Sequence, residues 1–196
     1  MKKVDSILVV NFITNIFYTA TYPYIYKVLY TNISENMIAL TTIISCLSII
    51  IFSTVWNKYG DKLYRFFPLF CIGEFAASIS LTLYLLNTYS YNSYYLYETF
   101  SMAIITRQIL CGMNRLKRIR YTDKDRELFD NRNSAWCSAG TIIGSLIAMI
   151  LNLNFETMLW IATFGNAIDN LSYSGIYFKE QKKARNNNEE RTKMAL

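Results

Sequence analysis

Long apolar segments alternate with short polar ones along the 196 residues of this chain. A helix that crosses a bilayer takes about 20 mostly apolar residues, and six segments fit: 6–29, 36–56, 66–86, 93–113, 134–153 and 155–178. Glu98 and Arg107 interrupt the fourth. The pattern predicts an all-α, polytopic integral membrane protein with six transmembrane helices in one bundle over residues 1–178. The charged, Asn-rich residues 179–196 predict a cytoplasmic tail that is disordered or loosely helical.

The Lys and Arg residues fall almost entirely on one side of this predicted bundle. Of the 20, 18 precede the first segment, follow the sixth, or lie between the second and third or the fourth and fifth. The other two are Lys27 and Arg107. Because Lys-rich and Arg-rich loops stay in the cytoplasm, we expect a multi-pass protein of the cell (plasma) membrane with both termini cytoplasmic. This topology accounts for the net charge of +6, so we expect the lipid bilayer as a partner and no nucleic acid.

The composition removes several kinds of chemistry. The chain has no His, which excludes Ser–His and Cys–His nucleophile pairs, His metal sites and His proton relays. Its four cysteines lie far apart, without metal-ligand spacing, at Cys46, Cys71, Cys111 and Cys137. We interpret them as small buried apolar residues. We therefore predict no enzyme activity, no metal and no cofactor.

The first segment carries a polar stripe. Asn11, Asn15, Tyr18 and Tyr22 are spaced by 4, 3 and 4 residues, which places them on one face of a helix. Such a face must look towards protein or water inside a membrane. It either forms the wall of a substrate cavity or holds helices together by hydrogen bonds.

Charged residues inside the apolar segments are the strongest functional signal, because an unpaired charge in a membrane costs several kilocalories. The four candidates are Glu74, Glu98, Arg107 and Asp169. Glu98 and Arg107 are nine residues apart, about 13–14 Å along a helix at 1.5 Å per residue, which is too far for a direct pair. Glu74 or Asp169 is the expected partner of Arg107. The group is either a structural ion pair or a proton-linked carboxylate whose charge Arg107 sets.

Two further faces predict helix packing. Small residues recur at every fourth position of the fifth segment, at Gly140, Gly144 and Ala148, and let another helix approach closely. The sixth segment has a polar face that we expect to be buried against protein, formed by Asn166, Asn170, Tyr173 and Tyr177.

The residues after the second segment resemble a loop motif of the major facilitator superfamily, roughly Gly-x-x-x-Asp-Arg/Lys-x-Gly-Arg-Arg/Lys. We expect a short cytoplasmic turn there, made by Asn57, Lys58, Tyr59, Gly60, Asp61 and Lys62. Lys58, Gly60 and Lys62 match the motif. Three positions differ: Ser53 replaces the first Gly, Asn57 the Asp and Asp61 the Arg.

Other motifs of the superfamily follow in the same order. Arg107 looks like the Arg in the cytoplasmic half of helix four that the family links to proton coupling. The spacing of Gly140, Gly144 and Ala148 is similar to the antiporter motif Gly-x-x-x-Gly-Pro-x-x-Gly-Gly, with Ser145 in place of the Pro. Residues 131–134 look like that family's entry to helix five. Residues 160 and 169–172 resemble helix six of drug-efflux members of the macrolide-exporter type.

The resemblance spans about residues 6–180 and implies the amino-terminal six-helix half of a twelve-helix transporter. It implies proton-linked efflux of an amphipathic small molecule or peptide, after formation of a homodimer or pairing with a second six-helix half. The chain stops where the family's linker to helix seven would begin, so an inactive truncated remnant is a third interpretation. A different class is a non-transporting six-helix binding, immunity or accessory protein of the membrane.

Overall fold

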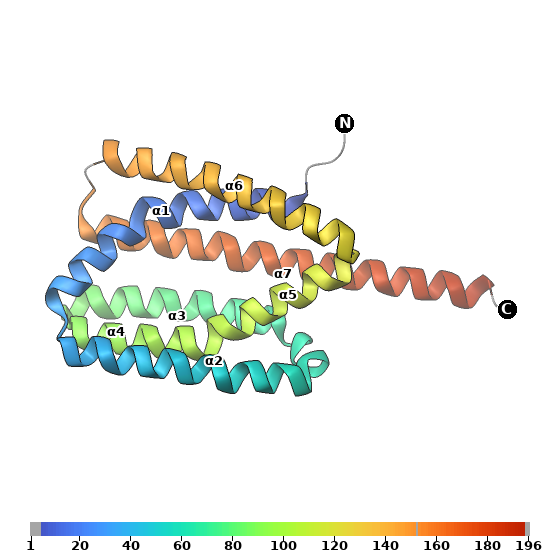
Figure 1. The fold of residues 1–196 in the computed structure, drawn as a ribbon, viewed down its shortest axis with the longest axis horizontal. Helices are drawn as coiled ribbons and strands as arrows, with labels where there is room; N and C mark the ends of the chain where they lie inside the picture. Colours follow the sequence, from blue (N-terminus) through green and yellow to red (C-terminus); the bar gives the residue numbers. More distant parts are fainter. Residues whose placement is uncertain (1–4, 152, 195–196) are drawn as a thin grey trace.

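The chain forms long helices joined by short turns in the computed structural model (Figure 1), which describes residues 5–151 and 153–194, with side chains as far as Asn186. Residues 91–120 form a continuous helical rod, the α4–α5 rod, with one π-helical turn, η1, in its middle. The described residues contain helices and no strand, which confirms the all-α class. The elements are α1 (Ser6–Asn32), α2 (Glu35–Tyr64), α3 (Phe67–Thr88), α4 (Tyr91–Ser101), η1 (Met102–Thr106), α5 (Arg107–Arg120), α6 (Asp123–Ile150) and α7 (Phe155–Met194).

Capping side chains fix where the helices begin. Asp5 accepts a hydrogen bond of 2.9 Å from the Ile7 backbone N–H at the start of α1. Thr122 accepts one of 3.3 Å from the Asp125 backbone N–H at the start of α6. These caps satisfy backbone donors that lack a partner within the helix. At the C-terminal end of α3, Tyr89 adopts the left-handed conformation, with φ of 50°.

The helices extend beyond the predicted apolar segments, because charged residues continue them. Residues 57–62 lie near the end of α2, so the predicted turn there is wrong. Lys62 suits the negative end of the helix dipole, and the chain turns only at 65–66, before Pro68 in the first turn of α3. The basic stretch between the fourth and fifth segments is also helical, except at 121–122. Residues 179–194 continue α7, so of the two predicted alternatives, disordered or helical, the structure has the helical one.

Four helices form a ring in which each packs against the next. α1 contacts α7, α7 contacts α3, and α3 contacts the α4–α5 rod. The rod and α1 meet at both ends of the ring: Arg120 pairs with Asp5 at 3.2 Å at one end, and the rings of Tyr30 and Tyr95 lie 6.0 Å apart at the other. α6 packs outside α1, and α2 packs outside the rod (Figure 1).

The bundle consists of two segments of three helices, and the helices of each segment pack mainly against those of the other. The first contains α1, α2 and α3, and the second contains the α4–α5 rod, α6 and α7. The first helix of each segment packs against the middle helix of the other, and the last helices, α3 and α7, pack against each other. Because each segment has an odd number of helices, the two begin at opposite ends of the bundle (Figure 1). This arrangement matches two repeats of inverted topology.

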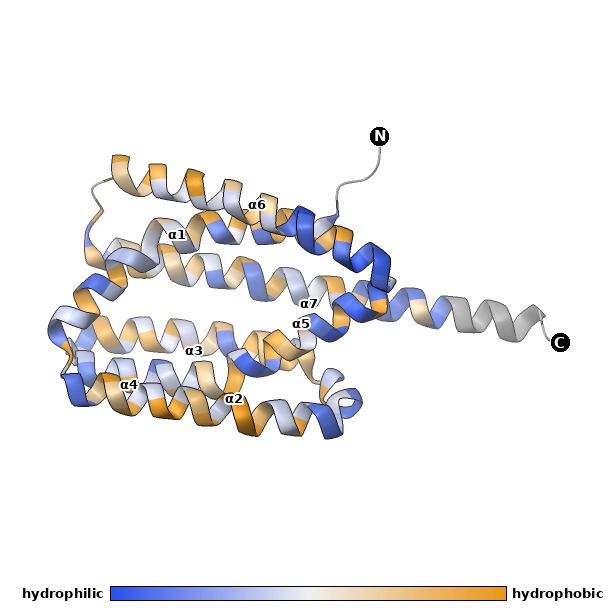
Figure 2. Ribbon diagram, in the orientation of Figure 1, coloured by the Kyte–Doolittle hydropathy of each residue, from blue (hydrophilic) through white to orange (hydrophobic). Residues whose placement is uncertain are grey.

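Many large apolar side chains of α2, α3 and α6 are exposed on the outside of the bundle, and the middle turns of α2 and much of α6 are apolar (Figure 2). Within the described residues, three helices are long and apolar enough to cross a membrane: α2, α3 and α6. Ile50 on α2 and Ile142 on α6 are 65% and 63% exposed. Exposed apolar surface of this extent indicates contact with lipid or with another protein. Together with the three long apolar helices, this surface supports a membrane-associated helical protein.

Candidate functional site

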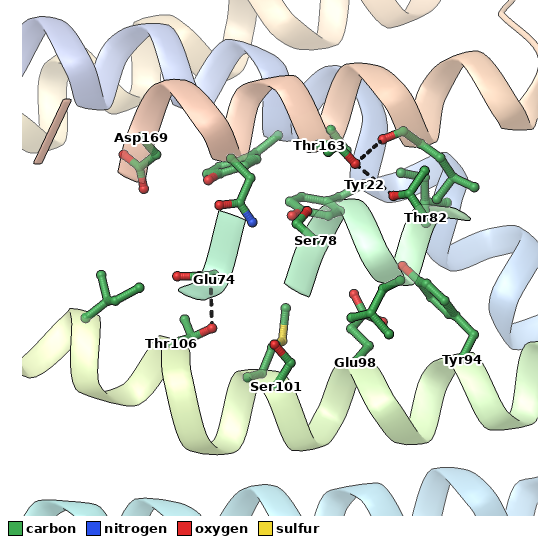
Figure 3. A pocket seen from close by; sticks show the side chains of 18 of the residues that line it. Tyr22, Glu74, Ser78, Thr82, Tyr94, Glu98, Ser101, Thr106, Thr163 and Asp169 are labelled. Carbon is green, nitrogen blue, oxygen red and sulfur yellow. Dashed lines mark hydrogen bonds between the residues drawn. The ribbon is translucent and has the colours of Figure 1, made fainter. Parts of the chain in front are cut away.

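A cavity of about 290 Å³ lies inside the four-helix ring (Figure 3). Every helix of the ring contributes to its wall, including Tyr22 of α1, Ser78 of α3, Thr106 of η1 and Thr163 of α7. Its volume is at the small end of ligand pockets. Three acidic side chains also line it, one from each of three elements: Glu74, Glu98 and Asp169. The fold therefore brings together three of the four intramembrane charges singled out in the sequence.

Glu74 and Asp169 lie towards one end of the cavity, and Glu98 lies towards the other (Figure 3). Glu74 accepts a hydrogen bond of 2.9 Å from the Thr106 hydroxyl, which joins α3 to η1. The Glu98 Oε2 atom is buried and has no hydrogen-bond partner among the described residues. The two ends of the cavity thus differ: one carboxylate has a neutral donor, and the other has an unsatisfied oxygen.

Arg107 lies outside this cavity and is half-buried. No ion pair within 4.0 Å joins it to Glu74 or Asp169 in the part of the chain that the structure describes, so the expected pairing is absent. The π turn at 102–106 adds about one residue to a helical turn, and Thr106, the last residue of that turn, faces Glu74.

The polar stripe of α1 divides into two parts. Tyr18 and Tyr22 line the cavity. Asn11 instead donates to the Asn133 side chain at 2.6 Å and accepts from the Tyr173 hydroxyl at 2.6 Å. Both predicted alternatives therefore occur on one face of α1. Its C-terminal part lines a cavity, and its N-terminal part holds α6 and α7 by hydrogen bonds.

Asn15 belongs to the second part of that stripe. Its side-chain amide donates to the Cys137 carbonyl at 2.5 Å and to the Thr141 hydroxyl at 2.7 Å, both on α6. These bonds flank the position where Gly140 meets α1. The Asn side chains and the Gly positions thus build one helix contact together.

Four tyrosines of α1 form a ladder that runs from the cavity to the end of the helix. The ring centroids of Tyr18 and Tyr22 lie 5.1 Å apart, those of Tyr22 and Tyr26 5.7 Å, and those of Tyr26 and Tyr30 5.8 Å. Tyr30 is 51% exposed. The sequence analysis found only the first two rings, although the spacing of four residues continues through Tyr26 and Tyr30 and was the available signal.

Gly140 and Gly144 face α1 rather than a second copy of the chain. A Cβ atom built on Gly140 would lie 2.8 Å from the Phe12 carbonyl oxygen, and one on Gly144 would lie 2.5 Å from the Ile16 carbonyl oxygen. Only Gly permits such close approach of the two backbones. Ala148, the third small residue of the ladder, is half-buried. The close packing predicted from these residues lies within the bundle.

The residues of the loop motif lie on the last turns of α2. Asp61 forms an ion pair with Arg115 and so connects α2 to α5. Lys58 lies over the ring of Tyr59, with its Nζ atom 5.3 Å from the centroid. Asn57 and Lys62 are exposed, and Gly60 is partly buried. These side chains lie on α2 and α5, and none of them lines the cavity.

The polar face of α7 is buried, as its spacing suggested. Asn166 lines the cavity, while Asn170 donates to the Asn166 backbone carbonyl at 3.1 Å. Tyr177 packs against Tyr64, with ring centroids 5.0 Å apart. Sequence reasoning missed Thr163 on the same helix, whose hydroxyl shares a hydrogen bond of 2.8 Å with Thr82 of α3.

Asp5 closes one end of the ring. It accepts a hydrogen bond of 2.5 Å from the Tyr121 hydroxyl and pairs with Arg120 at 3.2 Å. Burial and the hydrogen bond to Asp5 raise the pKa of Tyr121, so its hydroxyl keeps the proton that it donates. Glu180 of α7 joins the same cluster, 3.9 Å from Arg120. The cluster ties α1, α5 and α7 together at the end where the chain begins.

Comparisons with protein-family models, with curated proteins and with solved structures find no match. Over the described residues there is also no group of three His, Cys, Asp or Glu side chains that could hold a metal ion.

Proposed function

We propose that this chain is one half of a membrane transporter that resembles the major facilitator superfamily and exports an amphipathic small molecule or peptide in exchange for protons. The observation that carries the proposal is the cavity with three carboxyl side chains, inside a bundle whose outer surface is apolar. Carboxyl groups at membrane depth are costly, and in membrane proteins they mark substrate and proton pathways.

The exchange of partners between the two three-helix segments supports the same proposal. Inverted repeats of this kind are common in secondary transporters, where the substrate lies near the middle of the membrane at the repeat interface. The cavity lies between the two segments: α1 and the α4–α5 rod, the first helices of the two segments, both line it. This part of the argument is an analogy of fold, and the carboxyl groups supply the chemistry.

In the proposed cycle a carboxylate releases the substrate and takes up a proton. Glu74, Glu98 and Asp169 are the groups available for this exchange. Tyr18 and Tyr22 supply ring faces to the apolar part of the substrate. The substrate path is completed by a second copy of the chain or by a separate six-helix half, in the plasma membrane with both termini in the cytoplasm.

Accumulation of ethidium, a fluorescent hydrophobic cation, tests this function in cells with and without the intact gene. We expect higher accumulation in cells without it, and no difference between the two when a protonophore collapses the proton gradient. Restoring the gene should restore efflux, and a Glu127→Gln variant, altered at an exposed carboxylate of α6, should do so equally well. Equal accumulation of ethidium, of a macrolide and of a cationic peptide in both strains would refute transport and favour a binding, immunity or accessory role.

A further inference from the structure

Glu98 is the least satisfied charged group of the cavity. One of its oxygens, Oε2, is buried without a hydrogen-bond partner among the described residues. A buried polar atom without a partner costs free energy, about 1–3 kcal/mol and more for a charged group. Such an atom in a folded protein calls for an explanation, and a partner group that enters the neighbouring cavity is one.

The surroundings of Glu98 are aromatic. Tyr22 of α1 and Tyr94 of α4 line the cavity at the same end (Figure 3). Tyr22 also belongs to the tyrosine ladder of α1, and its ring lies 5.7 Å from that of Tyr26. The negative face of an aromatic ring attracts a cation within about 6 Å. A single carboxylate next to tyrosine rings matches the recognition of an organic ammonium group.

The same surroundings do not suit a metal ion. Calcium takes six to eight oxygen ligands, and magnesium needs near-ideal octahedral coordination. Among the described residues, Glu98 supplies the only carboxylate at this end of the cavity, since Glu74 and Asp169 lie towards the other (Figure 3). The hydroxyls of Thr82 and Thr163 are bonded to each other at 2.8 Å. A soft, weakly hydrated cation therefore fits better than a hard one.

We propose that Glu98 and the rings of Tyr22 and Tyr94 form a binding subsite for an organic monocation with a quaternary or tertiary ammonium group. The ammonium group lies against the Glu98 carboxyl group, and the apolar substituents contact the tyrosine rings. The inference rests on the proposed function, because it names the substrate class of that transporter. Among the three carboxyl groups available for the proposed exchange, it assigns substrate binding to Glu98.

Equilibrium binding to the purified full chain in lipid nanodiscs tests the subsite. The probe is tritiated benzyltrimethylammonium, which is cationic, aromatic and unable to donate a strong hydrogen bond. Its neutral isostere is neopentylbenzene, in which carbon replaces the nitrogen. We expect saturable binding of the probe that excess unlabelled benzyltrimethylammonium displaces and neopentylbenzene does not. Displacement by neopentylbenzene at equal concentration would overturn the role of the charge.

Substitutions test which carboxyl group of the cavity binds the probe. Glu98→Gln should weaken binding by about tenfold or more, the effect expected for one charge-assisted contact. Glu98→Asp keeps the charge and should lose less. Tyr22→Leu should weaken binding by about threefold or more, while Tyr22→Phe, which keeps the ring, should lose less. Glu127→Gln is the matched control on the exposed surface. If Glu74→Gln costs as much as Glu98→Gln, the assignment of the subsite is wrong.

This measurement separates the subsite from transport. Saturable binding that depends on Glu98, without any effect of the gene on ethidium accumulation, would keep the subsite and refute the transporter. An effect of the gene on accumulation together with unaltered probe binding in Glu98→Gln would keep the transporter and refute the subsite. Gel filtration of each variant confirms that it is folded before its binding is compared.

Discussion

Thr106 donates a hydrogen bond of 2.9 Å to Glu74 at the wall of the cavity, from the π turn of the α4–α5 rod to α3. The bond gives the Glu74 carboxyl group a neutral partner where the sequence suggested a positive one. It also depends on the π turn, which ends at Thr106. Irregular turns of this kind occur often at functional sites.

The Thr106 hydroxyl should therefore contribute to stability as well as to the site. Thr106→Val removes the donor at nearly constant volume and should lower the free energy of unfolding by about 1 kcal/mol, or the unfolding midpoint by about 2–4 °C for a chain of this size. Thr106→Ser keeps the donor and should lose less. The measurement is thermal unfolding in detergent, followed by circular dichroism. Equal losses in the two variants would show that the methyl group, not the hydrogen bond, matters.

Gly144 should tolerate no side chain. A Cβ there would contact the Thr19 hydroxyl and lie 2.5 Å from the Ile16 carbonyl oxygen, a backbone atom that cannot rotate away. Gly144→Ala should therefore destabilise the bundle by about 1–3 kcal/mol, and Gly144→Leu should prevent the contact of α1 with α6. The measurement is again the unfolding midpoint.

A glycine in open space provides the matched control. A Cβ built on Gly175 of α7 has no atom within 4 Å, so Gly175→Ala should gain about 0.5–1 kcal/mol from reduced backbone freedom. Opposite signs for the two substitutions are the expected result. A stable Gly144→Ala variant that loses only its self-association would instead assign Gly144 to an interface between copies.

Much of the fold could be predicted from the order of apolar segments, and the boundaries could not. The pattern of apolar residues predicts which segments are buried in lipid or in protein. It does not predict the helical turns that charged residues form beyond those segments. The end of α2 is an example: Asp61 looks like part of a turn, yet it continues the helix and pairs with Arg115 of α5, more than fifty residues later. Such long-range pairs leave no periodic signal in one sequence.

The site shows the same limit. Helical spacing placed Asn11 and Tyr22 on one face correctly, but spacing cannot tell which part of a long face meets another helix and which meets a cavity. Arg107 was assigned a carboxylate partner by depth alone, and the π turn, which no sequence pattern announced, brings Thr106 there instead. Among the described residues, the Glu98 Oε2 atom has no hydrogen-bond partner. This property depends on the three-dimensional surroundings of the side chain, which the sequence does not show.

The transmembrane topology is a separate prediction. In a variant without native cysteines, single Cys residues at Asn92 and Asn154 should react from outside intact cells with an impermeant maleimide. Cys residues at Asp61 and Lys124 should react only after the membrane is opened. All four side chains are exposed in the bundle, so differences in labelling report the side of the membrane. Labelling of Lys124→Cys in intact cells would contradict the six-span topology.

The final prediction concerns assembly. α2 lies outside the α4–α5 rod and α6 lies outside α1. A two-fold axis that runs parallel to the helices, beside α1 and the rod, therefore brings α2 of one copy against α6 of the other. Cys46 of α2 is exposed. Cys46 lies eleven residues after Glu35, the first residue of α2, and Ile142 lies eight residues before Ile150, the last residue of α6. At 1.5 Å per residue, both therefore lie about 12–16 Å from the same end of the bundle.

Oxidative cross-linking in membranes tests this arrangement. With Cys71, Cys111 and Cys137 replaced by Ala, Ile142→Cys should form a disulfide-linked dimer with Cys46, and the dimer should disappear when Cys46→Ser is added. Ala76→Cys is the matched control, because it is exposed at a similar depth on α3, on another side of the ring, and it should remain monomeric. A dimer with Ala76→Cys but not with Ile142→Cys would assign the contact to the other face. A chain that stays monomeric throughout would rule out the homodimer and leave a separate six-helix half as the partner that completes the path.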